Sequence, residues 1–301
     1  MVFSLPSSFS DGAPGVPARQ DGRGRPALHR AVFALCVAFA AYSAAQSVSP
    51  RPSSYLGFDR NDYPGDQNLP VLRQTFSFLG YWLNNPPGEA TNNWADKRQT
   101  LNSAGFGFLV LFNGRLDAEL KTVRSAQNLG TTDAQFATVA ARREGFPART
   151  VIFLDQEEGG RMLPEQKAYI YAWLDAVAAS GFRAGIYCSG IAAKDDENII
   201  TADDIRHYAG GRSIIYFVSR DQCPPSPGCG FPKSAPDPSQ SGTRFADVWQ
   251  FAQSPRRPEY TARCPATYNP DGNCYPPGIA PKLHVDLDTA TSPDPSQGRT
   301  P

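Results

Sequence analysis

The sequence has few of the residues on which several common enzyme classes depend. Only 3 of its 301 residues are histidines, and His29 lies close to the start of the chain. A serine triad would have to recruit His207 or His284, and Ser189 stands in YCSGI, not in the G-x-S-x-G motif of serine hydrolases. These absences weigh against a serine hydrolase.

An excess of charge of either sign is also missing. Lys+Arg and Asp+Glu both number 29, so the formal net charge is +0 and the pI is near 6.8. Such a chain lacks the electrostatic footprint of a protein that binds nucleic acid or an anionic membrane surface. We therefore expect neither as a partner.

The longest apolar run, residues 31–45, is too short for a membrane span, because about fifteen residues fall below the roughly 20 that a bilayer needs. Basic residues precede it, and small residues follow before Gln46. This order is typical of a signal peptide. We predict a signal peptide over 1–45, a linker over 46–54 and a mature protein that is secreted or periplasmic, with an uncleaved anchor as the alternative.

Six cysteines fit an exported chain, and Cys36 would leave with the signal peptide. The last four form two pairs that bracket Pro-containing loops, and each pair is predicted to close locally: Cys223 with Cys229, and Cys264 with Cys274. Cys188, in the apolar run GIYC, is predicted to be a buried free thiol. Neither pair has zinc-site spacing, so no metal and no cofactor is expected.

Eight apolar segments have the length and composition of strands, and most are separated by helical patterns or by loops long enough to cross over. They cover residues 55–60, 76–84, 105–114, 150–155, 183–190, 213–220, 245–253 and 282–288. This pattern predicts an α/β protein with a (β/α)8 barrel over 55–290, as a single domain with Cys- and Pro-rich loop insertions. A doubly wound sheet is the alternative, but GFGFLV lacks the last glycine of a phosphate-binding loop.

Helical spacing is clearest over residues 163–179. Residues 116–129 and 133–143 are also helical by pattern, and Gly130 is expected to separate them. The Pro-rich tail, 291–301, is expected to be disordered.

The stretch TVIFLDQEEGGR, residues 150–161, is an apolar run that ends in three acidic residues. Alternation along a strand places Asp155 and Glu157 on one side, roughly 6.6 Å apart, a separation close to that of paired carboxylates in glycoside hydrolases. The alternative interpretation is a solvated strand end followed by a Gly-Gly turn.

Other polar side chains also stand at the ends of the predicted strands. In a (β/α)8 barrel the catalytic groups lie at the carboxyl ends of the strands. The acidic ones are Asp59, Asp155, Glu157, Asp286 and Asp288. The amide and aromatic ones are Tyr81, Trp82, Asn84, Asn113, Tyr187, Trp249 and Gln250. Clustered carboxylates hold protons near neutral pH, and aromatic faces suit sugar rings. His284 alternates onto the face of Asp286, either as a substrate contact or as a core histidine.

The ordered segments GFD, LDQE, GIYCS, WQF and VDLD resemble family-25 glycoside hydrolases, the barrel-fold muramidases. They resemble still more closely a secreted glycoside-hydrolase-like family known as domain of unknown function 1906. The resemblance implies Glu157 as the general acid and Asp155 as its partner, with Asp59 and Asp286 completing an acidic pocket. It also implies that Trp249, Gln250 and Tyr187 line the pocket.

The sequence departs from the muramidases at Asp288, where they commonly carry Asn, at Glu158 and in the Cys-bearing insertions. We expect Tyr81, Trp82, Asn113 and Asp288 to bind substrate as well. The predicted function is cleavage of a glycosidic bond in a cell-wall or extracellular glycan by a monomeric protein. A catalytically silent barrel that binds glycan is the alternative.

Overall fold

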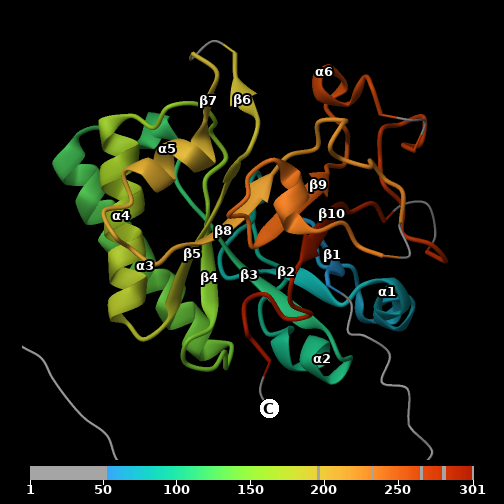
Figure 1. Ribbon diagram of the computed structural model, residues 1–301. Helices are drawn as coiled ribbons and strands as arrows, with labels where there is room; N and C mark the ends of the chain where they lie inside the picture. Colours follow the sequence, from blue (N-terminus) through green and yellow to red (C-terminus); the bar gives the residue numbers. More distant parts are fainter. Residues whose placement is uncertain (1–52, 195–196, 232–233, 265–266, 280–282, 300–301) are drawn as a thin grey trace, which may run out of the picture. The chain divides into compact units, whose positions relative to one another are not determined.

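Eight strands close into a barrel in the order β1-β10-β9-β8-β5-β4-β3-β2, as predicted (Figure 1). The strands are β1 (Tyr55–Asp59), β2 (Phe78–Trp82), β3 (Gly107–Asn113), β4 (Val151–Asp155), β5 (Arg183–Ser189), β8 (Ile215–Ser219), β9 (Val248–Ala252) and β10 (Asp286–Ala290). Two short strands, β6 (Ala192–Ala193) and β7 (Ile199–Ile200), pair with each other outside the barrel.

The computed structural model describes residues 53–299 apart from 195–196, 232–233, 265–266 and 280–282. The predicted signal peptide lies outside these residues, as does most of the predicted linker. No helix within the described ranges is long and apolar enough to cross a membrane.

Six helices accompany the strands in the described part of the chain. They are α1 (Leu69–Thr75), α2 (Arg98–Ser103), α3 (Val123–Arg143), α4 (Pro164–Ala179), α5 (Thr201–His207) and α6 (Pro258–Thr261). Short 3-10 turns occupy Asp66–Asn68, Asp117–Glu119 and Pro238–Ser241.

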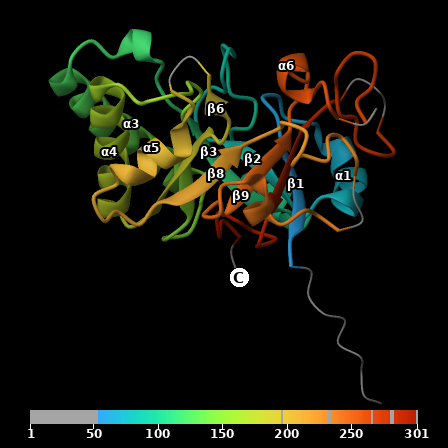
Figure 2. The same cartoon turned by 45° about the horizontal axis from the view of Figure 1, so that its top comes forward.

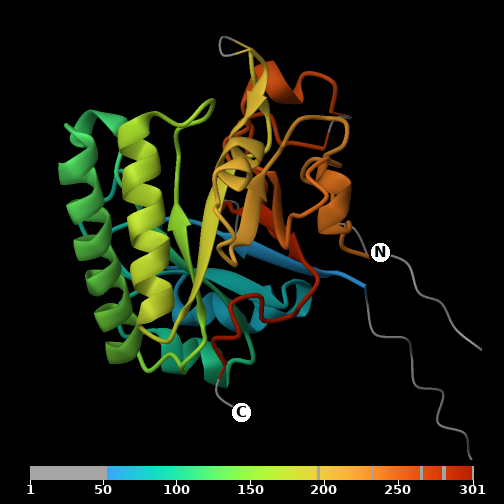
Figure 3. The ribbon, with the colours of Figure 1, turned by 60° about the vertical axis from the view of Figure 1, so that its left-hand side comes forward.

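Helix α3 is continuous through Gly130, so the predicted break at that glycine is wrong. The helices α3 and α4 lie side by side against the barrel (Figure 3). A Cβ atom on Gly130 would lie 2.2 Å from the carbonyl oxygen of Tyr169 in α4. The glycine therefore permits close approach of the two helices.

Strand β10 runs antiparallel to both neighbours, β1 and β9, whereas the other strand pairs of the barrel are parallel. Because β10 is antiparallel to β9, it starts at the end of the barrel where β9 ends. The chain between them therefore needs no crossover to the other end. Asp286 therefore begins β10, whereas the sequence placed it near the end of the last strand. Its side chain still lies at the rim where the parallel strands end.

The tail does not have the predicted disorder over its described residues, 291–299. Because β10 runs away from the rim where the parallel strands end, it brings the tail to the opposite rim, where N–H groups of β3 and β4 need acceptors. Ser296 accepts from the N–H of Val110 through its hydroxyl at 2.8 Å and from that of Val151 through its carbonyl at 2.8 Å. Arg98 donates to the carbonyl of Gly298 at 2.7 Å, and the tail closes this rim.

The two disulfides are Cys223–Cys264 and Cys229–Cys274, which corrects the predicted local pairs. Each one joins the loop after β8 to the loop after β9, across sequence separations of 41 and 45 residues. These loops leave adjacent strands at the same rim and lie near α6 (Figure 2). The paired cysteines are thus close in space but distant in sequence. Cys188 is free and buried, as predicted.

Candidate active site

A cavity of about 390 Å³ opens at the rim where the parallel strands end. Its acidic lining residues are Asp59, Asp62, Glu89, Asp155, Glu157 and Asp286. Trp82, Tyr187, Gln250, Gln253 and His284 also line it. The four predicted catalytic carboxylates therefore lie together, although they come from β1, β10, the end of β4 and the segment that follows it.

Gln250 in β9 connects the two sides of this cavity. Its Nε2 donates to Asp59 Oδ2 at 2.8 Å and to Asp286 Oδ2 at 3.3 Å. Its Oε1 accepts from the hydroxyl of Tyr187 at 2.8 Å and from Gln253 Nε2 at 3.0 Å. The amide thus fixes the orientation of two carboxylates and one tyrosine.

Asp155 and Glu157 line the cavity together, and the charge of Glu157 affects the pKa of Asp155. Asp155 is buried, whereas the Glu157 side chain is exposed at the mouth. Burial, reinforced by the charges of Glu157 and Asp59, holds the pKa of Asp155 well above its ordinary value. Burial of its carboxyl and the charge of Asp59 also raise the pKa of Glu157, against the opposing charge of Arg257. Asp155 therefore holds a proton more strongly than Glu157 does.

Asp288 is fully buried behind the cavity lining, near Asp59, and neither of its carboxyl oxygens has a hydrogen-bond partner among the described residues. Burial is the main cause that raises the pKa of Asp288 well above its usual range, and the charge of Asp59 adds to it. Burial also raises the pKa of Asp59, but the hydrogen bond from Gln250 opposes this. Asp288 therefore holds a proton more strongly than Asp59 does.

Asp286 faces Asp59 across the β1–β10 ladder. Its Oδ1 accepts the backbone N–H of Ser254 at 2.6 Å. Burial, and then the charge of Asp59, raise the pKa of Asp286 well above its ordinary value. Burial and neighbouring charges thus raise the pKa values of all these carboxyl groups, as is typical of groups that exchange protons in acid–base chemistry.

Two aromatic residues do not lie in the cavity, contrary to expectation. Adjacent residues on a strand face opposite sides, so Trp82 lines the cavity while Tyr81 points to the helices and donates to Glu144 Oε2 at 2.5 Å. By the same alternation Gln250 faces inward, while Trp249 is fully buried and donates its indole N–H to the carbonyl of Arg220 at 2.8 Å.

Asn113 and Asp288 are also outside the lining. Asn113 is tied to the loop after β2, because its backbone N–H donates to Asn84 Oδ1 at 2.8 Å and its amide donates to the carbonyl of Asn85 at 3.0 Å. Asp288 lies near Asp59, behind the cavity lining. Both can influence the site only through these partners.

The sequence did not single out Arg60, Gln253, Ser254 or Arg257, which lie at or beside the cavity. All four follow the end of a strand, and this position in the sequence could have identified them as candidates. In the described part of the chain, no cluster of three or more His, Cys, Asp or Glu side chains is arranged to hold a metal ion.

Residues 79–226 match the family described as "Rv2525c-like, glycoside hydrolase-like domain". This match confirms the resemblance to a glycoside-hydrolase-like family. No curated protein matches the chain.

Several solved structures are similar. An uncharacterised protein of B. stearothermophilus has 18% identity and a TM-score of 0.52, over 78% of this chain and 95% of that one. The Tat-secreted protein Rv2525c of Mycobacterium tuberculosis has 12% identity and a TM-score of 0.46, over 80% and 96%. The spore cortex lytic enzyme SleM of Clostridium perfringens has 15% and 0.46, over 81% and 69%. The similarity to the B. stearothermophilus protein establishes a shared fold and nothing about activity.

Proposed function

We propose that this protein is an extracytoplasmic glycosidase that hydrolyses a glycosidic bond in a cell-wall or extracellular glycan. The carrying observation is the cavity in which Asp59, Asp155, Glu157 and Asp286 lie together, with Asp288 buried nearby. The match to a glycoside-hydrolase-like family supports the reaction class. The two disulfides support an oxidising compartment, where such bonds persist.

The Asp155–Glu157 pair is the proposed general acid. Glu157 is the exposed member, so it contacts the glycosidic oxygen, and the single proton of the pair passes from Asp155 to Glu157, which delivers it to that oxygen. As the bond between the anomeric carbon and that oxygen breaks, positive charge develops on the sugar ring. Asp59, in its ionised form, stabilises that ring. Water then attacks the anomeric carbon, and its proton passes to an ionised carboxylate.

The substrate contacts follow from the lining. Trp82 and Tyr187 present aromatic groups, and Gln253 and His284 provide hydrogen-bonding groups beside the carboxylates. Burial and the charge of Arg60 lower the pKa of His284, so that it is neutral in the cavity. We propose that these residues position the sugar.

The test is reducing-end release from a panel of peptidoglycan and polysaccharide substrates. Glu157→Gln keeps shape but cannot donate the proton, so we expect the rate to fall about 10²- to 10⁴-fold. Wild-type activity should also fall on the alkaline side, as the raised pKa values of Asp155 and Glu157 are passed and the proton is lost.

Glu158→Gln is the matched control, because it removes a carboxylate one residue away on the other face. Glu158 accepts from the N–H of Asp117 at 2.7 Å and from Gln166 Nε2 at 2.8 Å, and it lines no part of the cavity. It should keep its activity. A wild-type protein that binds glycan but releases nothing from any substrate would contradict the glycosidase and favour the silent binder.

A further inference from the structure

A second cavity, of about 170 Å³, adjoins the first. Glu157, Tyr187 and Gln253 line both cavities, so the cleft continues past the proposed acid. Its other walls are formed by the Gly159–Gly160 turn, the segment after β5 and the start of α6. A glycan bound across Glu157 would therefore place one sugar residue in each cavity.

The two cavities differ in charge. Six acidic side chains line the first, with Arg60 as its basic member. Among the described residues that line the second, Arg257 is the only basic one and Glu157 the only acidic one. The Arg257 side chain is 45% exposed, and its guanidinium makes no hydrogen bond to a described residue. Its N–H donors are open to a ligand.

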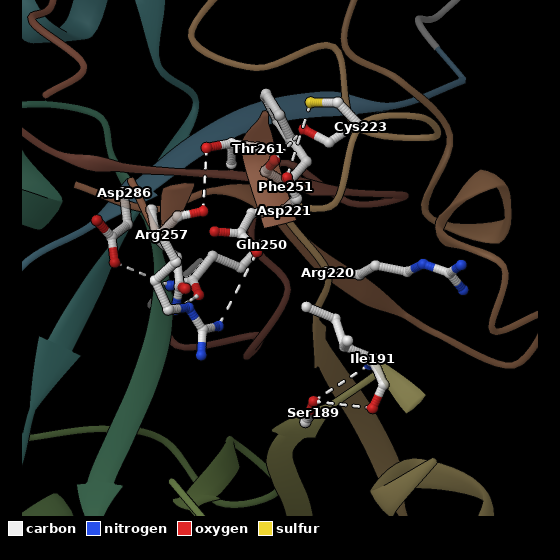
Figure 4. Close-up of polar contacts among 12 residues, drawn as sticks. Ser189, Ile191, Arg220, Asp221, Cys223, Gln250, Phe251, Arg257, Thr261 and Asp286 are labelled. Carbon is white, nitrogen blue, oxygen red and sulfur yellow. Dashed lines mark hydrogen bonds and ion pairs between the residues drawn. The ribbon is translucent and has the colours of Figure 1, made fainter. Parts of the chain in front are cut away.

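The position of Arg257 is fixed from several directions. Its backbone carbonyl accepts from the N–H of Tyr260 at 3.0 Å and from the hydroxyl of Thr261 at 3.0 Å, at the start of α6. Its guanidinium lies 3.9 Å from Asp221 Oδ1 (Figure 4). Arg220, from the same segment as Asp221, points away from Arg257 in that view.

Asp221 is an unusual anchor, because its side chain is 0% exposed and has no hydrogen-bond partner in any other described residue. A buried carboxylate without such partners is costly, and Arg257 is its ion-pair partner. The disulfide Cys223–Cys264 joins the two loops that carry this pair. The loop insertions thus hold a guanidinium next to the proposed acid.

We propose that the second cavity binds a sugar residue bearing a carboxylate, with Arg257 as the group that recognises it. Arginine suits this role, because its planar fork can donate two parallel hydrogen bonds to a carboxylate. Arg257 then sets substrate specificity, and the substrate class is an acidic glycan such as a uronic-acid polymer. This inference rests on the proposed function, since the cavity shares Glu157 with the catalytic one.

The test compares glucuronic-acid-containing oligosaccharides with the same oligosaccharides after chemical reduction of their carboxylates to primary alcohols. The measured quantity is the ratio of kcat/KM for the two forms. We expect wild type to prefer the carboxylated form by about ten- to a hundredfold, as for hydrogen bonds to a charged group. Arg257→Gln should bring the ratio close to one, mainly by raising KM for the carboxylated form.

Arg263→Gln is the matched control, because it removes the same charge from an exposed position in the same loop that lines neither cavity. It should keep the wild-type ratio. A ratio near one in wild type would overturn the proposal. So would an Arg257→Gln variant that keeps the wild-type ratio but shifts the pH profile for both forms equally, since Arg257 would then act only on Glu157.

Binding separates this proposal from the glycosidase itself. Titration calorimetry with both oligosaccharide forms measures the preference without turnover. Preferential binding that depends on Arg257, with no hydrolysis, would overturn the glycosidase and keep the subsite. Hydrolysis with equal binding of the two forms would overturn the subsite and keep the glycosidase.

Discussion

The two sides of the barrel are built differently. On one side, β3, β4 and β5 are covered by α3 and α4, which pack through buried side chains such as Phe112 and Trp173, with ring centroids 6.2 Å apart. On the other side, β8, β9 and β10 are followed or preceded by long loops joined by two disulfides. The helix-covered side supplies Asp155 and Glu157. The disulfide-joined side supplies Gln250, Asp286 and Arg257.

This difference shows how one site combines two kinds of structural support. Asp155 ends β4 and Glu157 follows it. The position of this strand is determined by its local apolar pattern and by helix packing. The groups that complete the site belong to loops with little regular structure, which need covalent and polar links to hold their positions. We therefore expect the two sides to respond differently to the same kind of perturbation.

The largest effect should follow loss of the disulfide that ties Asp221 and Arg257 together. Cys223→Ser/Cys264→Ser should lower the free energy of unfolding by about 2 to 4 kcal/mol, since the link closes a long loop in the unfolded chain. Hydrogen exchange should rise in the loops after β8 and β9 and not in α3 or α4. Cys188→Ala is the control for loss of a cysteine without a link. Equal exchange on both sides would contradict the comparison.

The helix-covered side can be perturbed through Gly130. Gly130→Ala would place a Cβ 2.2 Å from the carbonyl oxygen of Tyr169, so α3 and α4 must separate. Overpacking of this kind typically costs about 1 to 3 kcal/mol of the free energy of unfolding. Denaturant unfolding measures the loss, with the exposed Thr131→Ala on the same helix as control. Glycan release should persist, and its loss would show that the two sides are coupled.

The smallest effect should be a gain in stability at Asp288. Its folded-state pKa is raised by burial, so the folded protein binds a proton that the unfolded chain has released once the pH exceeds about 4. Stability from this group is complete below that pH and is lost as the pH rises toward the folded-state pKa.

Asp288→Asn removes this loss, because the asparagine side chain is uncharged at every pH in this range. We expect the free energy of unfolding at pH 8 to rise by about 1 kcal/mol, with no gain at pH 3. Urea unfolding at both pH values measures the difference. A loss of stability at pH 8 would mean that the charge on Asp288 supports the fold.

Much of the fold was predictable because its signals are local. The apolar runs indicated the eight strands, and the spacing in 163–179 indicated α4. The antiparallel β10 was not predictable, since nothing local specifies whether a strand pairs with its neighbours in the parallel or the antiparallel sense. Gly130 was misinterpreted because its reason is contact with Tyr169 in another helix. The tail was misinterpreted because its partners, Val110 and Val151, are far away in sequence.

For the candidate site, the sequence by itself determined which residues end the strands, and alternation placed Asp155 and Glu157 on one face. Only the tertiary structure decided that Asp288 lies below Asp59, that Tyr81 and Trp249 face away from the cavity, and which cysteines pair. The physical reason is that side-chain direction repeats every two residues within a strand. Proton sharing and loop pairing, by contrast, depend on distances between segments that the chain order does not specify.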